Sequence, residues 1–147
     1  MKINQTKLYN VVFPIWFIWV YPQTWIYIIL GNFLIDSVIY IVSMNILKME
    51  NKMELYKGNI FAIFMFGLLS DFFGSMFILL LNACGLGVGS DDYLYISIAV
   101  LISAVLIFVF NYFCTFRDLN KRDRLVLSLI FSILTAPYTF FFPYGLY

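Results

Sequence analysis

The sequence contains no histidine and only two cysteines, Cys84 and Cys114. Without an imidazole, the chain cannot form a His-ligated haem, most zinc and copper sites, or a catalytic triad that depends on histidine. The two cysteines flank a complete apolar segment and belong to no C-x-x-C motif. We therefore expect neither an intramolecular disulfide nor a thioredoxin-like redox site.

Charged residues are also scarce. They make up 12% of the 147 residues, whereas apolar residues make up 63%, and the mean hydropathy is +0.92. A soluble domain is about a quarter charged, and a disordered chain combines low hydrophobicity with high charge. The composition therefore excludes both classes and predicts an integral membrane protein.

Four polar or turn-like breaks divide the chain into five apolar segments. They cover residues 6–21, 25–47, 59–83, 93–114 and 125–146. A membrane-spanning helix needs about 20 mostly apolar residues. We therefore predict a single transmembrane domain over residues 1–147, an all-α compact bundle of five transmembrane helices. Pro14 lies inside the first segment, so a re-entrant first segment remains an alternative to a complete span.

The positions of the basic residues predict the orientation of this bundle. All nine Lys and Arg lie before the first segment, between the second and third, or between the fourth and fifth. The opposite side carries Asp91 and Asp92 and no base. Because cytoplasmic loops are enriched in Lys and Arg, we expect a cytoplasmic N-terminus and an external C-terminus. This bias fits a multi-pass protein of a bacterial inner membrane.

Two acidic residues, Asp36 and Asp71, lie near the middle of the second and third segments. An aspartate at the centre of a spanning helix costs about 2.5–3.5 kcal/mol on insertion scales. Both carboxyls are therefore expected to face the bundle interior, at a similar depth because the two helices would be antiparallel. Two nearby carboxyls in a medium of low dielectric constant cannot both ionise cheaply, so proton and cation occupancy would alternate.

This pattern predicts a transporter or channel for a cation, or for a small solute coupled to H⁺ or Na⁺. The ion-binding residues would share helix faces with the two acids, and small residues would allow close helix packing. The predicted ion or substrate ligands are Asp36, Asp71, Asn32, Ser70 and Tyr40, and the predicted packing positions are Gly67 and Gly74. We predict no catalytic residue, no metal site and no cofactor other than a bound monovalent cation.

Pro137 interrupts the fifth segment and predicts a kink there, because proline removes one backbone hydrogen bond and frees the carbonyl of Ile133. Thr135 or Ser132 could compensate for the lost bond, as hydroxyls do in other membrane helices.

Two other functions remain open from the sequence. In a non-transporting accessory, assembly or immunity subunit, the acids would hydrogen-bond neighbouring helices or pair with a base on a partner. In a membrane-embedded enzyme, they would act as general acid and base; we rank this third. The expected partners are the lipid bilayer, a small ion or solute, and either a second copy or a membrane partner protein. Nothing in the sequence predicts nucleic-acid binding.

Overall fold

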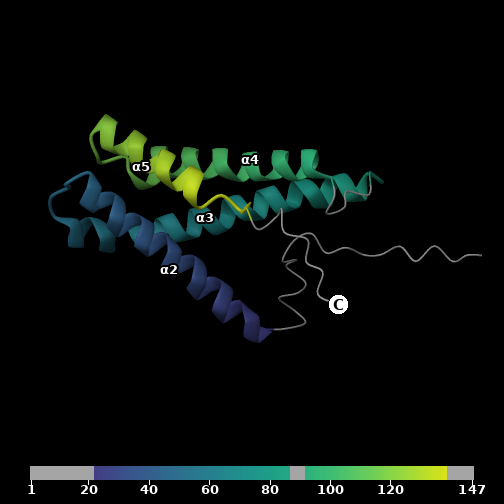
Figure 1. Ribbon diagram of the computed structural model, residues 1–147, viewed down its shortest axis with the longest axis horizontal. Coiled ribbons are helices and arrows are strands. Elements are labelled where there is room, and N and C mark those ends of the chain that lie inside the picture. The colour runs from purple at the N-terminus through teal and green to yellow at the C-terminus, as the bar shows by residue number, and fades with distance from the viewer. Residues whose placement is uncertain (1–21, 87–91, 139–147) are drawn as a thin grey trace, which may run out of the picture.

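The computed structural model describes residues 22–86 and 92–138, and every regular element within them is a helix (Figure 1). The elements are α2 (Pro22–Ile46), α3 (Lys52–Ala83), α4 (Tyr93–Phe110), the short π-helix η1 (Asn111–Thr115) and α5 (Lys121–Leu134). Three stretches are long and apolar enough to cross a membrane: Ile29–Ile46, Lys52–Ala83 and Tyr93–Thr115. The chain is thus all-α, with the features of a multi-pass membrane protein.

The number of candidate spans corrects the prediction of five transmembrane helices, because the described residues contain three. The first predicted segment, residues 6–21, lies outside the described residues. The fifth predicted segment, residues 125–146, overlaps α5, which begins at Lys121 and ends at Leu134 after 14 residues. Such a helix is about 21 Å long at 1.5 Å per residue, which is less than the hydrocarbon core of about 30 Å.

Pro137 accounts for part of this difference. The residue before a proline is disfavoured in the α region, so helices commonly end ahead of it. Helix α5 ends three positions before Pro137, so the described structure has a helix terminus here and not a kinked continuation. The Ile133 carbonyl, which the sequence predicts to be free, accepts a hydrogen bond from the Tyr138 hydroxyl at 2.6 Å.

Helices α3 and α4 lie antiparallel and form the longest contact in the bundle (Figure 1). Helix α5 packs against α4 and α2 at one end, beside the connections between α2 and α3 and between η1 and α5. The C-terminal half of α2 packs against α3, whereas its N-terminal half diverges from the other helices (Figure 1). Four elements therefore meet at one end of the molecule, and fewer meet at the other.

We call the four-element end the basic end and define it as residues 47–58 and 115–124. It carries all seven Lys and Arg of the described residues. They are Lys48, Lys52, Lys57, Arg117, Lys121, Arg122 and Arg124. The two basic connections of the sequence thus lie on the same side of the bundle, as the orientation inferred from charge requires.

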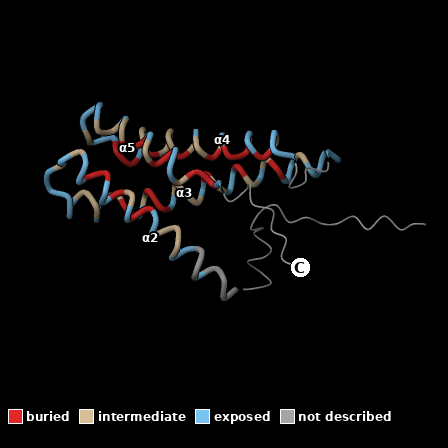
Figure 2. Tube along the Cα trace, viewed as in Figure 1, coloured by how far each residue is buried: buried red, intermediate tan, exposed pale blue. Residues whose placement is uncertain are grey.

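The buried side chains form two clusters along the inner faces of the helices (Figure 2). The larger lies toward the basic end and contains Tyr40, Met44, Ile60, Ile63, Ile107, Phe116, Leu127 and Phe131. The smaller contains Ile78, Ile96, Ala99, Val100 and Ala136. In the larger cluster the Tyr40 ring lies 5.7 Å from Phe116 and 6.0 Å from Phe131, as measured between centroids. These aromatic contacts join α2 to the residue that follows η1 and to α5.

The π-helix η1 continues α4 without a break. Its defining bond runs from the Phe116 amide to the Asn111 carbonyl at 2.9 Å, five residues back instead of four. Isolated π turns inside α-helices are rare and are common at functional sites. Here the π turn coincides with two buried polar side chains, Asn111 and Thr115.

Candidate functional site

The Asp36 carboxyl lies in the interface between α2 and α3. Its side chain is buried, with 6% of the residue exposed. A methyl group built on Gly67 would lie 3.8 Å from Asp36 Oδ2, so this oxygen lies against the backbone of α3 at a position with no side chain. The glycine thus leaves open space beside the carboxyl.

Asp71 lies one helical turn beyond Gly67 on α3, on the same face. The residue is half-buried, and its Oδ1 atom is fully buried. The structure therefore brings Asp36 and Asp71 to the same region of the α2–α3 interface.

Neither carboxyl has a hydrogen-bond partner among residues 22–86 and 92–138, and Asp71 Oδ1 is both buried and unpaired. Buried polar groups in proteins are nearly always hydrogen-bonded, because an unpaired one costs about 1–3 kcal/mol. If the two acids only fastened helices together, each would bond a neighbouring hydroxyl or amide. The part of the chain that is described contains no such bond.

The other predicted ligands and the second predicted packing position, Gly74, occupy different positions around the acids. Asn32 is half-buried one turn before Asp36, and Gly74 is buried on α3. Ser70 is completely buried, and its hydroxyl donates to the Phe66 carbonyl at 2.7 Å. Its own carbonyl accepts a bond from the Ser103 hydroxyl of α4 at 2.9 Å. Ser103, which is also completely buried, was not predicted from the sequence.

Tyr40 belongs to a separate hydrogen-bond network nearer the basic end. Its hydroxyl accepts a bond from the Asn59 amide at 3.0 Å and lies 3.4 Å from the Leu55 carbonyl. In the same interface the Tyr56 hydroxyl donates to Ser37 Oγ at 2.9 Å. Tyr40 thus links α2 to the start of α3, and no bond joins it to either carboxyl.

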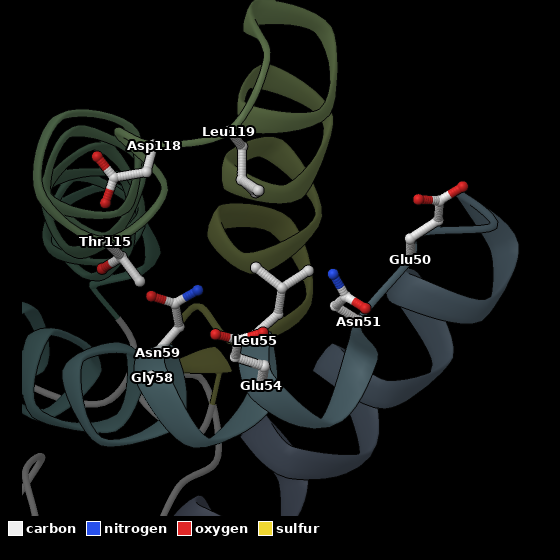
Figure 3. A pocket seen from close by; sticks show the side chains of 9 residues that line it. All are labelled: Glu50, Asn51, Glu54, Leu55, Gly58, Asn59, Thr115, Asp118 and Leu119. Atoms are coloured by element: carbon white, nitrogen blue, oxygen red, sulfur yellow. The ribbon is translucent and has the colours of Figure 1, made fainter.

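A cavity of about 300 Å³ opens at the basic end, between the start of α3 and the η1–α5 connection (Figure 3). It is lined by Glu50, Asn51, Glu54, Leu55, Gly58, Asn59, Thr115, Asp118 and Leu119. Three acids but no base line it, although the basic end as a whole is rich in Lys and Arg. The three acids lie on different sides of the cavity (Figure 3), and the described residues hold no cluster of three metal-binding side chains.

Comparison of the chain with protein-family models, with curated proteins and with solved structures found no match.

Proposed function

We propose that this protein is a small polytopic membrane transporter or channel. Its solute would be a cation, or a small solute coupled to H⁺ or Na⁺, and the Asp36–Asp71 pair would bind the ion. The observation that carries the proposal is the placement of two carboxyls at the α2–α3 interface: Asp36 is buried beside Gly67, and Asp71 Oδ1 is buried without a hydrogen-bond partner. Ionisable groups inside a membrane are expensive and are retained mainly where they line an ion or substrate pathway.

The orientation of the protein follows from the charges of the basic end. Because cytoplasmic loops are rich in Lys and Arg, the basic end would face the cytoplasm. The acid pair would then lie within the hydrocarbon layer, where a bound cation or a proton compensates its charge. A proton and a cation would compete for the same two carboxyls, which gives the alternation that a coupled carrier requires.

The first test is a thermal-stability scan of the purified protein in detergent with Na⁺, K⁺, Mg²⁺ or Ca²⁺. A ligand present at 100 times its Kd stabilises the folded state by about 2.7 kcal/mol. For a protein of this size, such a change shifts Tm by roughly 5–11 °C. We expect one cation to raise the Tm of the wild type. The same cation should leave the Tm of the Asp36→Asn and Asp71→Asn variants unchanged.

Asparagine keeps the shape of the carboxyl and removes its charge, so both variants should fold. Each should melt at or above the temperature of the ion-free wild type, because a buried charge has been removed. Retention of the full cation response in both variants would overturn the proposed function. An Asp92→Asn variant is the matched control, because that residue is exposed and lies just before α4, away from the basic end.

The accessory-subunit alternative makes a different prediction for the same residues. An acid that pairs with a partner must be reachable from outside the chain, whereas 6% of Asp36 is exposed. Asp71 is half-buried and is the better candidate for such a contact. Co-purification of a second membrane protein that is lost in Asp71→Asn and kept in Asp36→Asn would support the alternative.

A further inference from the structure

Unpaired polar atoms are concentrated around the π-helix. The described residues contain five buried side-chain nitrogen or oxygen atoms without a hydrogen-bond partner, and four of them belong to Asn111, Thr115 and Arg124. The fifth is Oδ1 of Asp71. Asn111 is the extreme case, because it is completely buried and both its amide nitrogen and its amide oxygen are unpaired. Buried polar atoms without a hydrogen-bond partner are explained by a water molecule, a bound ion or a functional role.

Three of these atoms, on Asn111 and Thr115, lie on one inner stripe of α4 and η1, whereas Arg124 Nε belongs to α5. Ser103, Ile107, Asn111 and Thr115 recur every four residues and are all buried. At one end of the stripe Ser103 bonds the carbonyl of Ser70, which directly precedes Asp71. At the other end Thr115 lines the cavity of the basic end, with 7% of the residue exposed and an unpaired hydroxyl (Figure 3).

We propose that the cavity is the entrance of a pathway for a hydrated cation, which runs along this stripe to Asp36 and Asp71. The inference rests on the proposed function and adds the route by which the ion arrives. Acidic side chains around the entrance attract a cation. The Asn111 amide and the Thr115 hydroxyl replace part of its hydration shell inside the protein.

One apolar layer interrupts the pathway. Ile107 is the only apolar member of the stripe, and Ile63 of α3 belongs to the same apolar cluster. Both are almost completely buried. On the stripe, Ile107 lies between Asn111 and Ser103 and separates the two polar layers, so the structure corresponds to a closed state of the route. Hydrophobic constrictions of this kind block ions by excluding water.

The first experiment compares stability with ion flux in the variant Asn111→Leu. Leucine is similar in size to asparagine and removes two unpaired buried polar atoms, so the Tm should stay equal or rise. The flux of Na⁺ or H⁺ into liposomes containing the full chain should nevertheless fall at least tenfold. A lower Tm with unchanged flux would identify Asn111 as a structural residue and overturn the pathway.

The second experiment enlarges the constriction. Ile107→Ser should raise the Na⁺ or H⁺ flux at least fivefold, because it makes the stripe continuously polar. The matched control is Val105→Ser on the same helix, because Val105 is 51% exposed on the face directed away from the bundle. Equal effects of the two substitutions would overturn the role of Ile107.

A third measurement does not depend on flux. In a chain with Cys84→Ser and Cys114→Ser, the variant Asn111→Cys should react with a small cationic thiol reagent added from the basic side. The variant Val105→Cys should react at least a hundredfold more slowly, because a thiol that faces lipid does not ionise. Equal rates would show that water does not reach Asn111.

These outcomes separate the pathway from the proposed function. If Asp36→Asn and Asp71→Asn lose the cation response while Asn111→Leu keeps full flux and position 111 is unreactive, the acid pair stands and this route fails. If both aspartate variants keep the cation response, the proposed function fails, and the pathway that serves it is overturned with it.

Discussion

Gly67 is the residue that determines how much space surrounds the Asp36 carboxyl. A Cβ atom at this position would contact Asp36 Oδ2 at 3.8 Å, an ordinary van der Waals distance. Gly67→Ala should therefore fold, and alanine should favour the helix by up to about 1 kcal/mol relative to glycine. The methyl group would occupy space beside the carboxyl oxygen, so we expect about tenfold weaker cation binding, equivalent to about 1.4 kcal/mol. The midpoint of the cation-dependent rise in Tm measures this change.

Gly31 provides the matched control for this prediction. It lies in α2, and nothing comes within 4 Å of a Cβ atom built there. In Gly31→Ala, the midpoint of the cation-dependent rise in Tm should equal that of the wild type. A similar change of midpoint in both variants would mean that the space beside Asp36 does not matter.

The sequence predicts which polar residues face the bundle interior only where several of them recur at helical spacing. In the second segment, the spacing of Asn32, Asp36 and Tyr40 defines a face, and the structure buries the two latter residues. After the tyrosines of its first turn, helix α4 has only two polar residues, Ser97 and Ser103, and these two define no face. For this reason the contact of Ser103 with α3 could not be predicted.

At the scale of elements, the start of α5 depends on one cap. Asn120 Oδ1 accepts a bond from the Asp123 amide at 2.8 Å, and Asn120 Nδ2 donates to Asp123 Oδ2 at 2.7 Å. Loss of an N-cap costs about 1 kcal/mol, so Asn120→Ala should lower the Tm by about 2–4 °C. Asn120→Ser keeps a capping oxygen, so its Tm should be close to that of the wild type in the same melting experiment. Equal destabilisation by alanine and serine would contradict the capping role.

The predicted helix boundaries differ from the observed ones where charge and helix propensity disagree. The third segment was predicted to begin at residue 59, because Lys52, Glu54 and Lys57 are charged. Helix α3 begins at Lys52, since Lys, Met, Glu and Leu are all good helix formers and a helix can extend beyond the hydrocarbon layer. Hydropathy marks the membrane boundary, which need not be the end of the helix. The π turn of η1 has no signature in the sequence that we could recognise.

At the scale of the whole molecule, the two native cysteines lie at opposite ends of the bundle. Cys84 directly follows α3, Cys114 belongs to η1, and both are exposed. With the basic end in the cytoplasm, a membrane-impermeant maleimide added to intact cells should label Cys84 and not Cys114. Mass spectrometry of the labelled protein measures this difference.

Permeabilised cells and the single variants Cys84→Ser and Cys114→Ser provide the controls. Opening the membrane should make Cys114 reactive without changing the labelling of Cys84. Labelling of Cys114 alone in intact cells would reverse the proposed orientation.

The distribution of charge along the sequence predicts that the α2–α3 and η1–α5 connections lie on one side, and the structure places them together (Figure 1). The divergence of α2 from α3 could not be predicted in this way. It depends on which side chains meet across helices, such as the Phe33 and Phe64 rings at 5.7 Å. Hydropathy carries no information about such pairs.

Because of the π turn, the chain contains one residue more than a regular α-helix of the same length. Each residue of an α-helix turns the chain by about 100°. Deleting one residue within 111–115 would restore regular winding and rotate Phe116, the residue that ends the helix, by that angle. Phe116, which is completely buried, would then swing out of the core while α4 itself stayed in place. The surplus residue thus sets the direction in which the chain leaves the end of this helix, so insertions and deletions should be tolerated here far less than substitutions.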